Sequence, residues 1–131
     1  MTPQDLLYAE SHEWVKVAAE NGHKVATIGI SDFAVQQLTD LVFMQLKSAG
    51  TELKAGQEFG EVESVKAVSP LYMPVSGKIV AVNEQLPAKL ETLSSDPYGQ
   101  GWMIKVAITD EAELSKLLSP AAYQKQCEAE G

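Results

Sequence analysis

The sequence predicts a mostly β protein, folded as an antiparallel sandwich or barrel with a short internal helix and helices at its C-terminal end. Short segments rich in β-branched and aromatic residues recur along the chain, and turn-forming residues separate them. The 131 residues are enough for one domain, so we expect a single domain over residues 1–131. Hydrophobic residues make up 45% of the chain and charged residues 21%, which indicates a globular protein able to bury a core without disulfides or metals.

The first part of the chain predicts a β-hairpin followed by a helix. Segments 12–17 and 24–30 are β-rich, and residues 20–22 between them favour a turn. Ser31 and Asp32 predict a helix N-terminus, because their side chains accept hydrogen bonds from the first free N–H groups of a helix. The residues that follow at helical spacing are Phe33, Ala34, Gln37, Leu38 and Leu41.

The middle of the chain predicts three further strands, over 41–46, 59–65 and 77–82. Each is rich in apolar residues, and glycine-containing stretches separate the first two. The apolar residues of 79–82 are continuous, which predicts that this strand is buried on both faces.

The C-terminal part predicts a turn, a strand and helices. We expect 86–95 to be irregular, whereas 96–99 has the composition Asp-Pro-Tyr-Gly that favours a turn. Side chains alternate over 102–108, which predicts a strand with one core face. Asp110 can cap a following helix, and beyond the proline that ends it, segment 121–129 is expected to add one or two helical turns.

The charge of the chain excludes two classes of main partner. The formal net charge is −8, and all ten basic residues are lysines. Without arginine the chain lacks the planar fork that binds phosphate in a bidentate manner. An acidic surface also repels nucleic acid and anionic lipid, so we expect neither nucleic acid nor a membrane as the main partner.

Cysteine usage and hydropathy predict a soluble, cytoplasmic protein. Cys127 is the only cysteine, so no internal disulfide can form, which fits a reducing compartment. The first residues lack the basic and apolar parts of a signal segment, and no run approaches the roughly 20 apolar residues that span a bilayer. The histidines, the cysteine and the carboxylates stand at no ligand-like spacing, so no metal site is expected.

The most informative residue is Lys66, which lies between two β-type runs. Pro70 and Pro74 lack the N–H group of a ladder hydrogen bond, so we expect strand pairing to be interrupted there. Gly77 permits a positive φ or a close backbone approach. A lysine at such a bend projects from the domain, although a single exposed lysine is usually a surface residue with no further role.

Segment 63–67, with Gly77 eleven residues after Lys66, resembles the lipoylation site of the glycine cleavage H-protein family. The resemblance covers nearly the whole chain, and several independent motifs in register are more specific than one short pattern. The further matching segments are 11–15, 28–34, 74–77, 82–84, 96–99 and 101–105.

The resemblance implies a lipoyl carrier without catalytic activity of its own, with the barrel-sandwich hybrid fold of lipoyl domains. A lipoate ligase or lipoyl transferase would attach lipoate to Lys66 through an amide. The carrier would then shuttle an aminomethyl group among glycine decarboxylase, aminomethyltransferase and dihydrolipoyl dehydrogenase. No nucleophile, base and orienting group form a recognisable set in the sequence, which agrees with a carrier rather than an enzyme.

The resemblance also implies roles for four further residues. Glu63 and Gly77 would help to present the modified turn, and Ser11 and Glu13 would lie beside the loaded arm. For Glu13, an exposed strand carboxylate is an equally good expectation from the sequence.

The chain departs from the family pattern at several positions. The family has Ser-Asp where this chain has Ser69 and Pro70, and Pro70 supplies neither the negative charge nor a backbone donor. Gln45 and Lys47 stand where the family has Glu and Pro, and segment 89–94 also differs. We expect these positions to shelter the arm or to meet partners.

These departures leave the cargo open. A dithiol that carries sulfur would not need the missing carboxylate, as in the H-like lipoate-binding proteins that work beside a heterodisulfide-reductase-like complex in sulfur-oxidising prokaryotes. Aminomethyl transfer and sulfur transfer therefore both remain hypotheses. A further alternative is an interaction module that is not lipoylated and has lost the carrier function.

Overall fold

The computed structural model describes residues 6–20, 22–38 and 40–130. The strands are β1 (Leu7–Tyr8), β2 (Glu13–Glu20), β3 (His23–Ile30), β4 (Leu41–Leu46), β5 (Glu52–Leu53), β6 (Glu58–Ser64), β7 (Val68–Tyr72), β8 (Gly77–Val82) and β9 (Ile104–Ile108). The α-helices are α1 (Asp32–Leu38), α2 (Glu91–Ser95) and α3 (Pro120–Glu130). Two 3₁₀ helices are η2 (Leu86–Ala88) and η3 (Glu111–Lys116).

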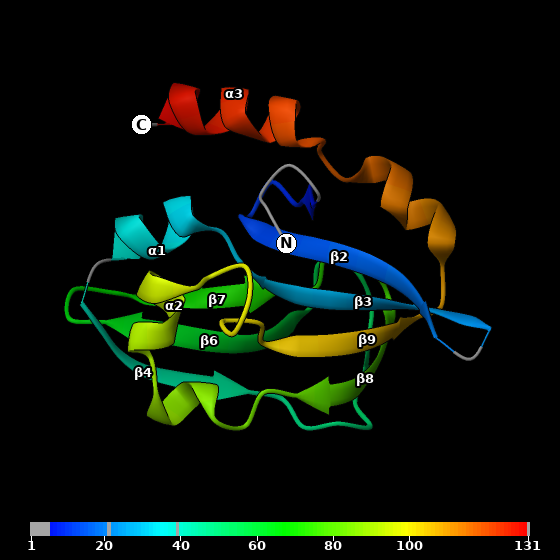
Figure 1. Cartoon of the computed structure of the whole chain (residues 1–131), viewed down its shortest axis with the longest axis horizontal. Coiled ribbons are helices and arrows are strands. Elements are labelled where there is room, and N and C mark those ends of the chain that lie inside the picture. Colours follow the sequence, from blue (N-terminus) through cyan, green and yellow to red (C-terminus); the bar gives the residue numbers. More distant parts are fainter. Residues whose placement is uncertain (1–5, 21, 39, 131) are drawn as a thin grey trace.

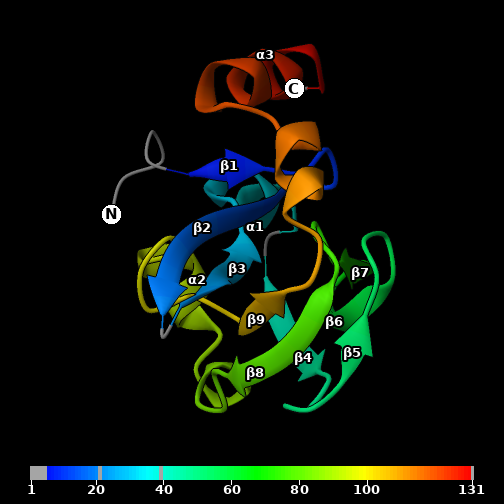
Figure 2. The ribbon, with the colours of Figure 1, turned by 90° about the vertical axis from the view of Figure 1, so that its right-hand side faces the viewer.

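Two antiparallel sheets pack against each other (Figures 1 and 2), which confirms the predicted fold class. One sheet has the strand order β1-β2-β3-β9-β8-β5, and the other has the order β4-β6-β7. The core between them takes Ile28 and Val106 from the larger sheet and Phe59 and Val62 from the smaller one. Each such buried side chain contributes roughly 1.5–3 kcal/mol of hydrophobic stabilisation.

The predicted hairpin is confirmed as β2 and β3, and it holds a large aromatic residue in place. Trp14 pairs with Gly29 across the hairpin, and a Cβ atom at Gly29 would lie 2.7 Å from the indole ring. The indole N–H donates a hydrogen bond to the carbonyl of Pro97 at 3.0 Å. Glycine is therefore required opposite Trp14, and three sequence motifs meet at this point.

The predicted helix N-terminus at Ser31 is also confirmed. The Ser31 hydroxyl accepts a hydrogen bond from the N–H of Ala34 at 3.2 Å, which satisfies one of the free donors of α1. Val35 is the buried residue of this helix. Leu41, which the helical spacing included, instead begins β4.

The prediction that 79–82 is buried on both faces is wrong. Ile79 is fully buried, but the side chain of Val80 is 47% exposed. The pairing register shifts between Ile79 and Ala81, because Val80 forms a β-bulge opposite β9. Val80 follows the inward-facing Ile79 and therefore points to the outside of the sheet.

Segment 86–95 was expected to be irregular, but it contains η2 and α2. Leu86 and Leu93 are both buried and anchor the two short helices to the core. Farther on, Asp110 caps a helix as predicted, and its carboxylate accepts a hydrogen bond from the N–H of Ala112 at 3.1 Å. That helix, η3, is a 3₁₀ helix.

Helix α3 is longer than the predicted one or two turns, with 11 residues. Its buried residue, Tyr123, stacks on the ring of Tyr8 with 4.2 Å between ring centroids. The backbone of Tyr8 also exchanges hydrogen bonds with that of Leu118, just before α3. Figure 2 shows the result, with α3 lying over β1. In the part of the chain that the structure describes, no helix is both long and apolar enough to cross a membrane.

Candidate functional site

Lys66 lies in the turn that joins β6 to β7, which projects from the left edge of the molecule in Figure 1. The N–H of Ser64 donates to the carbonyl of Ala67 at 2.8 Å, and the N–H of Ala67 donates to the Ser64 hydroxyl at 3.2 Å. The N–H of Val65 donates to the carbonyl of Asp40 at 2.9 Å, which ties the turn to the start of β4. The turn is therefore held through its backbone and through one serine.

The side chain of Lys66 is exposed, as expected of a lysine at a bend. Among the described residues, the ion pairs join His12 to Glu130 and Lys24 to Glu111, so neither pair involves Lys66. A modifying enzyme can reach such an amine from solvent.

The expected interruption of pairing at Pro70 is wrong. Pro70 lies within β7, opposite Glu61. Because Ser64 and Ala67 form a hydrogen-bonded pair, the alternation of an antiparallel ladder puts Pro70 at a non-hydrogen-bonded position. Its missing N–H would have pointed away from β6, so no ladder bond is lost on this edge strand. Pro74 lies beyond the end of β7.

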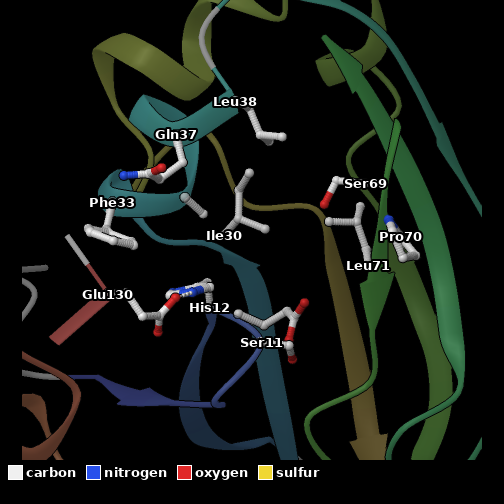
Figure 3. Close-up of a pocket in the computed structure, with 12 residues that line it drawn as sticks. Ser11, His12, Ile30, Phe33, Gln37, Leu38, Ser69, Pro70, Leu71 and Glu130 are labelled. Atoms are coloured by element: carbon white, nitrogen blue, oxygen red, sulfur yellow. Dashed lines mark hydrogen bonds and ion pairs between the residues drawn. The ribbon is translucent and has the colours of Figure 1, made fainter. Parts of the chain in front are cut away.

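The free edge of β7 forms one wall of a cleft with a volume of about 260 Å³. The segment before β2, the end of β3 and helix α1 form the opposite wall, and the end of α3 adds Glu130 (Figure 3). Ser69 and Leu71 point from β7 towards Ile30 and Leu38 in this view. Of the sequence-predicted residues, Ser11 and Glu13 line the cleft.

Glu13 is buried, with 1% of its surface exposed, so it is not an exposed strand carboxylate, and its role beside the loaded arm stays a prediction. Burial raises the pKa of its carboxyl group from 4.5 to about 7, whereas hydrogen bonds from the Ser11 hydroxyl and the Tyr72 N–H lower that pKa. The Tyr72 bond, 3.2 Å long, reaches Glu13 from the free edge of β7. Near neutral pH the cleft thus contains a carboxyl group close to its point of half-protonation.

His12 and Glu130 are cleft residues that the sequence did not predict. The backbone of His12 has a φ of 79°, which is unusual for a residue with a side chain. Its ring contacts the Tyr123 hydroxyl at 2.7 Å and Glu130 at 3.1 Å, and it stacks on Phe33. These contacts from α1 and α3 support the strained backbone beside Ser11 and Glu13.

Glu63 and Gly77 lie at different distances from the turn. Glu63 is half-buried on β6, opposite Val68 and three residues before Lys66. Gly77 begins β8, where a Cβ atom would lie 2.3 Å from Val106 Cγ1 and 2.4 Å from the carbonyl oxygen of Ala107. The requirement for glycine at this position is thus a close approach of β8 to β9. Roles for Glu63 and Gly77 in presenting the turn remain predictions.

The turn and the cleft lie along one strand, which suits a long acyl arm on Lys66. At about 3.3 Å per residue, Pro70 lies roughly 7 Å along β7 from Val68, the first strand residue after the Lys66 turn. Ile30, Phe33 and Leu71 give the cleft apolar surface, and Ser11 and Glu13 give it a polar end. The described residues contain no group of three side chains that could hold a metal ion.

Comparisons with known proteins agree over nearly the whole chain. The family model described as Glycine cleavage H-protein matches residues 6–130. A glycine cleavage system H protein from Rhodopirellula baltica is 56% identical over 130 residues, which cover 98% of this chain and 97% of that protein. One from Carboxydothermus hydrogenoformans is 53% identical over 131 residues and covers 100% of this chain and 98% of its own length.

A solved structure extends the comparison to three dimensions. The crystal structure of a glycine cleavage system H protein from Mycobacterium marinum matches with a TM-score of 0.82 and 39% identity. The match covers 95% of this chain and 98% of that one. None of these comparisons supports the sulfur-carrying alternative or its heterodisulfide-reductase-like partner. Members of the family hold lipoate on a lysine and have no catalytic activity of their own. The chain belongs to the glycine cleavage H-protein family.

Proposed function

We propose that this chain, acting as one domain in the cytoplasm, carries lipoate on Lys66 and shuttles the aminomethyl group of glycine cleavage. Its partners are glycine decarboxylase, aminomethyltransferase, dihydrolipoyl dehydrogenase and the enzyme that attaches lipoate. The observation that carries the proposal is the position of Lys66: an exposed amine at the tip of a hairpin, at the start of the strand whose free edge lines the cleft.

Lys66 must first become a nucleophile. A lysine ammonium has a pKa of about 10.4 in water, so the modifying enzyme must remove a proton before the amide forms. The turn presents the amine for that step, and its backbone hydrogen bonds keep the turn in place. Lipoate held on Lys66 would supply an S–S bond that is cleaved when the aminomethyl carbon, freed by the loss of CO2 from glycine, bonds to one sulfur and leaves the other as a thiol.

The cleft then provides a place for the end of the arm. Its apolar residues exclude water, which protects a labile cargo from hydrolysis. Glu13 offers a carboxylate to the cationic amine of the cargo, and the nearby positive charge lowers the pKa of Glu13 below its value in the empty cleft. Ser11 orients that carboxylate through its hydroxyl hydrogen bond.

Intact-mass measurement after incubation with a lipoate ligase, ATP and lipoate tests the attachment site. We expect a gain of one lipoyl group in the natural chain and in the control Lys78→Arg, which replaces another exposed lysine. The gain should vanish in Lys66→Arg. A Lys66→Arg chain that still gains the group would show that another residue is the attachment site.

A second measurement separates a carrier from an interaction module without lipoate. Glycine decarboxylase, aminomethyltransferase with its one-carbon acceptor, and dihydrolipoyl dehydrogenase with its oxidant are supplied with the lipoylated or the unmodified chain, and glycine turnover is followed. If the chain is a lipoyl carrier, glycine should be turned over only with the lipoylated chain. Equal partner binding by both forms, with no turnover by either, would favour the interaction module.

A further inference from the structure

Most of the exposed large apolar side chains in the described residues gather around Lys66. Val80 lies apart on β8 in the larger sheet. The other four, which we name the hairpin patch, are Val42 (55% exposed), Phe43 (46%), Val65 (73%) and Val68 (56%). Single exposed apolar residues are common on proteins, but a cluster of them indicates an interaction surface.

Backbone geometry places the first part of the patch on the outside. Leu41 pairs with Ser64 and Phe43 pairs with Glu63, so Val42 is an extra residue that forms a β-bulge in β4. In a regular strand Val42 would share a face with Met44, which is buried in the core. The bulge instead leaves both Val42 and Phe43 exposed, directly beside the strand that leads into the Lys66 turn.

Strand pairing joins the second part of the patch to the first. Phe43, Glu63 and Val68 face one another in a row across β4, β6 and β7. Gln45, Glu61 and Pro70 form the next row on the same outer face of the sheet. This face thus has an apolar end next to Lys66, flanked by two carboxylates.

We propose that the hairpin patch is the docking surface for the enzyme that acylates Lys66, an inference that rests on the proposed function. Before modification, Lys66 has only its four-carbon stem, so an enzyme that holds its amine must contact the surface of the turn. After modification the arm is longer, so the other partner enzymes can bind its end without contacting the surface of the turn. The acylating enzyme is therefore the partner for which the patch is unavoidable.

Charge indicates the chemistry of the complementary surface. Glu61 and Glu63 border the patch, and the whole chain carries a net charge of −8. The surface that fits is apolar at its centre, to bury Phe43 and the valines, with lysine or arginine residues at its rim facing the two glutamates.

Steady-state kinetics of lipoylation, with the carrier as the varied substrate of a lipoate ligase, test the proposal. The test variant combines Val42→Thr, Phe43→Thr and Val68→Thr, because threonine is β-branched and suits a strand. The control is Val80→Thr, since Val80 also lies at a bulge and has a similar exposed fraction, 47%. Thermal unfolding shows first that both variants fold.

In the triple variant we expect KM for the carrier to rise about tenfold with kcat nearly unchanged, because truncating apolar anchors weakens docking and leaves the chemistry intact. The control should match the natural chain. A folded triple variant with unchanged kcat/KM would overturn the docking proposal. If the natural chain itself gains no lipoyl group on Lys66, both this inference and the proposed function fail.

Two further measurements test the charged residues that border the hairpin patch and the possibility that a second copy of the chain occupies it. KM of the natural chain should rise with salt, and Glu61→Gln should reduce that dependence, because screening acts on the charged rim. A self-associated natural chain that becomes monomeric in the triple variant, as measured by sedimentation, would assign the patch to a second copy of the chain and overturn the proposal.

Discussion

At Glu13 the free-energy cost of burying a charge opposes the need for a carboxylate in the cleft. The side chain is almost completely buried, yet it accepts hydrogen bonds from Ser11 and from the backbone of Tyr72. Those bonds favour the ionised form, but burial outweighs them and the pKa rises to about 7. The residue is therefore ready to ionise when a cation arrives.

This pKa predicts a pH dependence of stability that Glu13→Gln should remove. The folded state binds the proton more tightly than the unfolded chain, whose carboxyl has a pKa of 4.5. The contribution of Glu13 to the free energy of unfolding is therefore fully present below pH 4.5 and is lost as pH rises through about 7. The loss is of the order of 3 kcal/mol.

Urea unfolding of the natural chain and of Glu13→Gln at pH 5 and pH 8 measures this effect. The stability of the natural chain relative to Glu13→Gln should decrease over that range. Glu84→Gln, which replaces an exposed carboxylate, is the control and should show the pH dependence of the natural chain. Parallel curves for Glu13→Gln and the natural chain would contradict the raised pKa.

At the scale of elements, the buried side chain of Tyr123 joins α3 to the cleft, in addition to Glu130 at the end of the helix. The buried Tyr123 hydroxyl contacts the Ser31 hydroxyl at 2.5 Å and the His12 ring at 2.7 Å. Ser31 caps α1, and His12 lies between the cleft residues Ser11 and Glu13. A single hydroxyl thus links α3, α1 and the start of β2.

Tyr123→Phe should therefore destabilise the fold by about 1–2 kcal/mol, since it leaves the buried Ser31 and the half-buried His12 without that hydrogen bond. Amide hydrogen exchange should also quicken in α1 and α3, the helices that the hydroxyl joins. Tyr72→Phe, a half-buried tyrosine on β7, serves as the control. Unchanged exchange in α1 would show that the hydroxyl does not couple the two helices.

The elements that the sequence predicted well are those with a clear local pattern. The hairpin of β2 and β3 has its turn residues, and α1 has its cap at Ser31. Helices η2 and α2 were missed because each spans only a few residues, too few to show a helical period. The length of α3 was underestimated because Tyr123 is its one buried residue, so no apolar stripe marks the helix.

Other features depend on tertiary pairing that no local pattern reveals. The bulges at Val42 and Val80 occur in apolar runs without a glycine or proline at the bulged position, so no local pattern indicated them. Glu130 joins the cleft through His12, a residue 118 positions earlier in the chain. Motifs pointed to Ser11 and Glu13, which line the cleft, but the burial of Glu13 required the folded structure.

At the scale of the whole molecule, the cleft is assembled from both sheets, α1 and the end of α3. Ser11 and Glu130 lie near the two ends of the chain, whereas β7 comes from the middle of the chain. The cleft therefore brings together residues that are far apart in the sequence. On the edge of β7, Pro70 occupies the position where the family pattern has a carboxylate. Along the cleft lining, the carboxylates that remain are Glu13 and the more exposed Glu130.

Pro70→Asp should therefore slow the loss of an aminomethyl load from the lipoylated chain. Pro70 borders the cleft from the outer side of β7, so a carboxylate there would lie at the rim of the cleft and attract the cationic amine, more strongly where water is excluded. About 1 kcal/mol of added attraction would slow release roughly fivefold. The measurement is the rate of formaldehyde and ammonia release from the loaded chain.

Pro70→Ser separates charge from backbone effects, because it restores the N–H donor without adding a carboxylate. We expect Pro70→Ser to release its load at nearly the rate of the natural chain. Equal slowing by both substitutions would assign the effect to the backbone N–H that proline lacks. Equal rates in all three chains would show that the edge of β7 does not face the load, and the arm would have to lie elsewhere on the molecule.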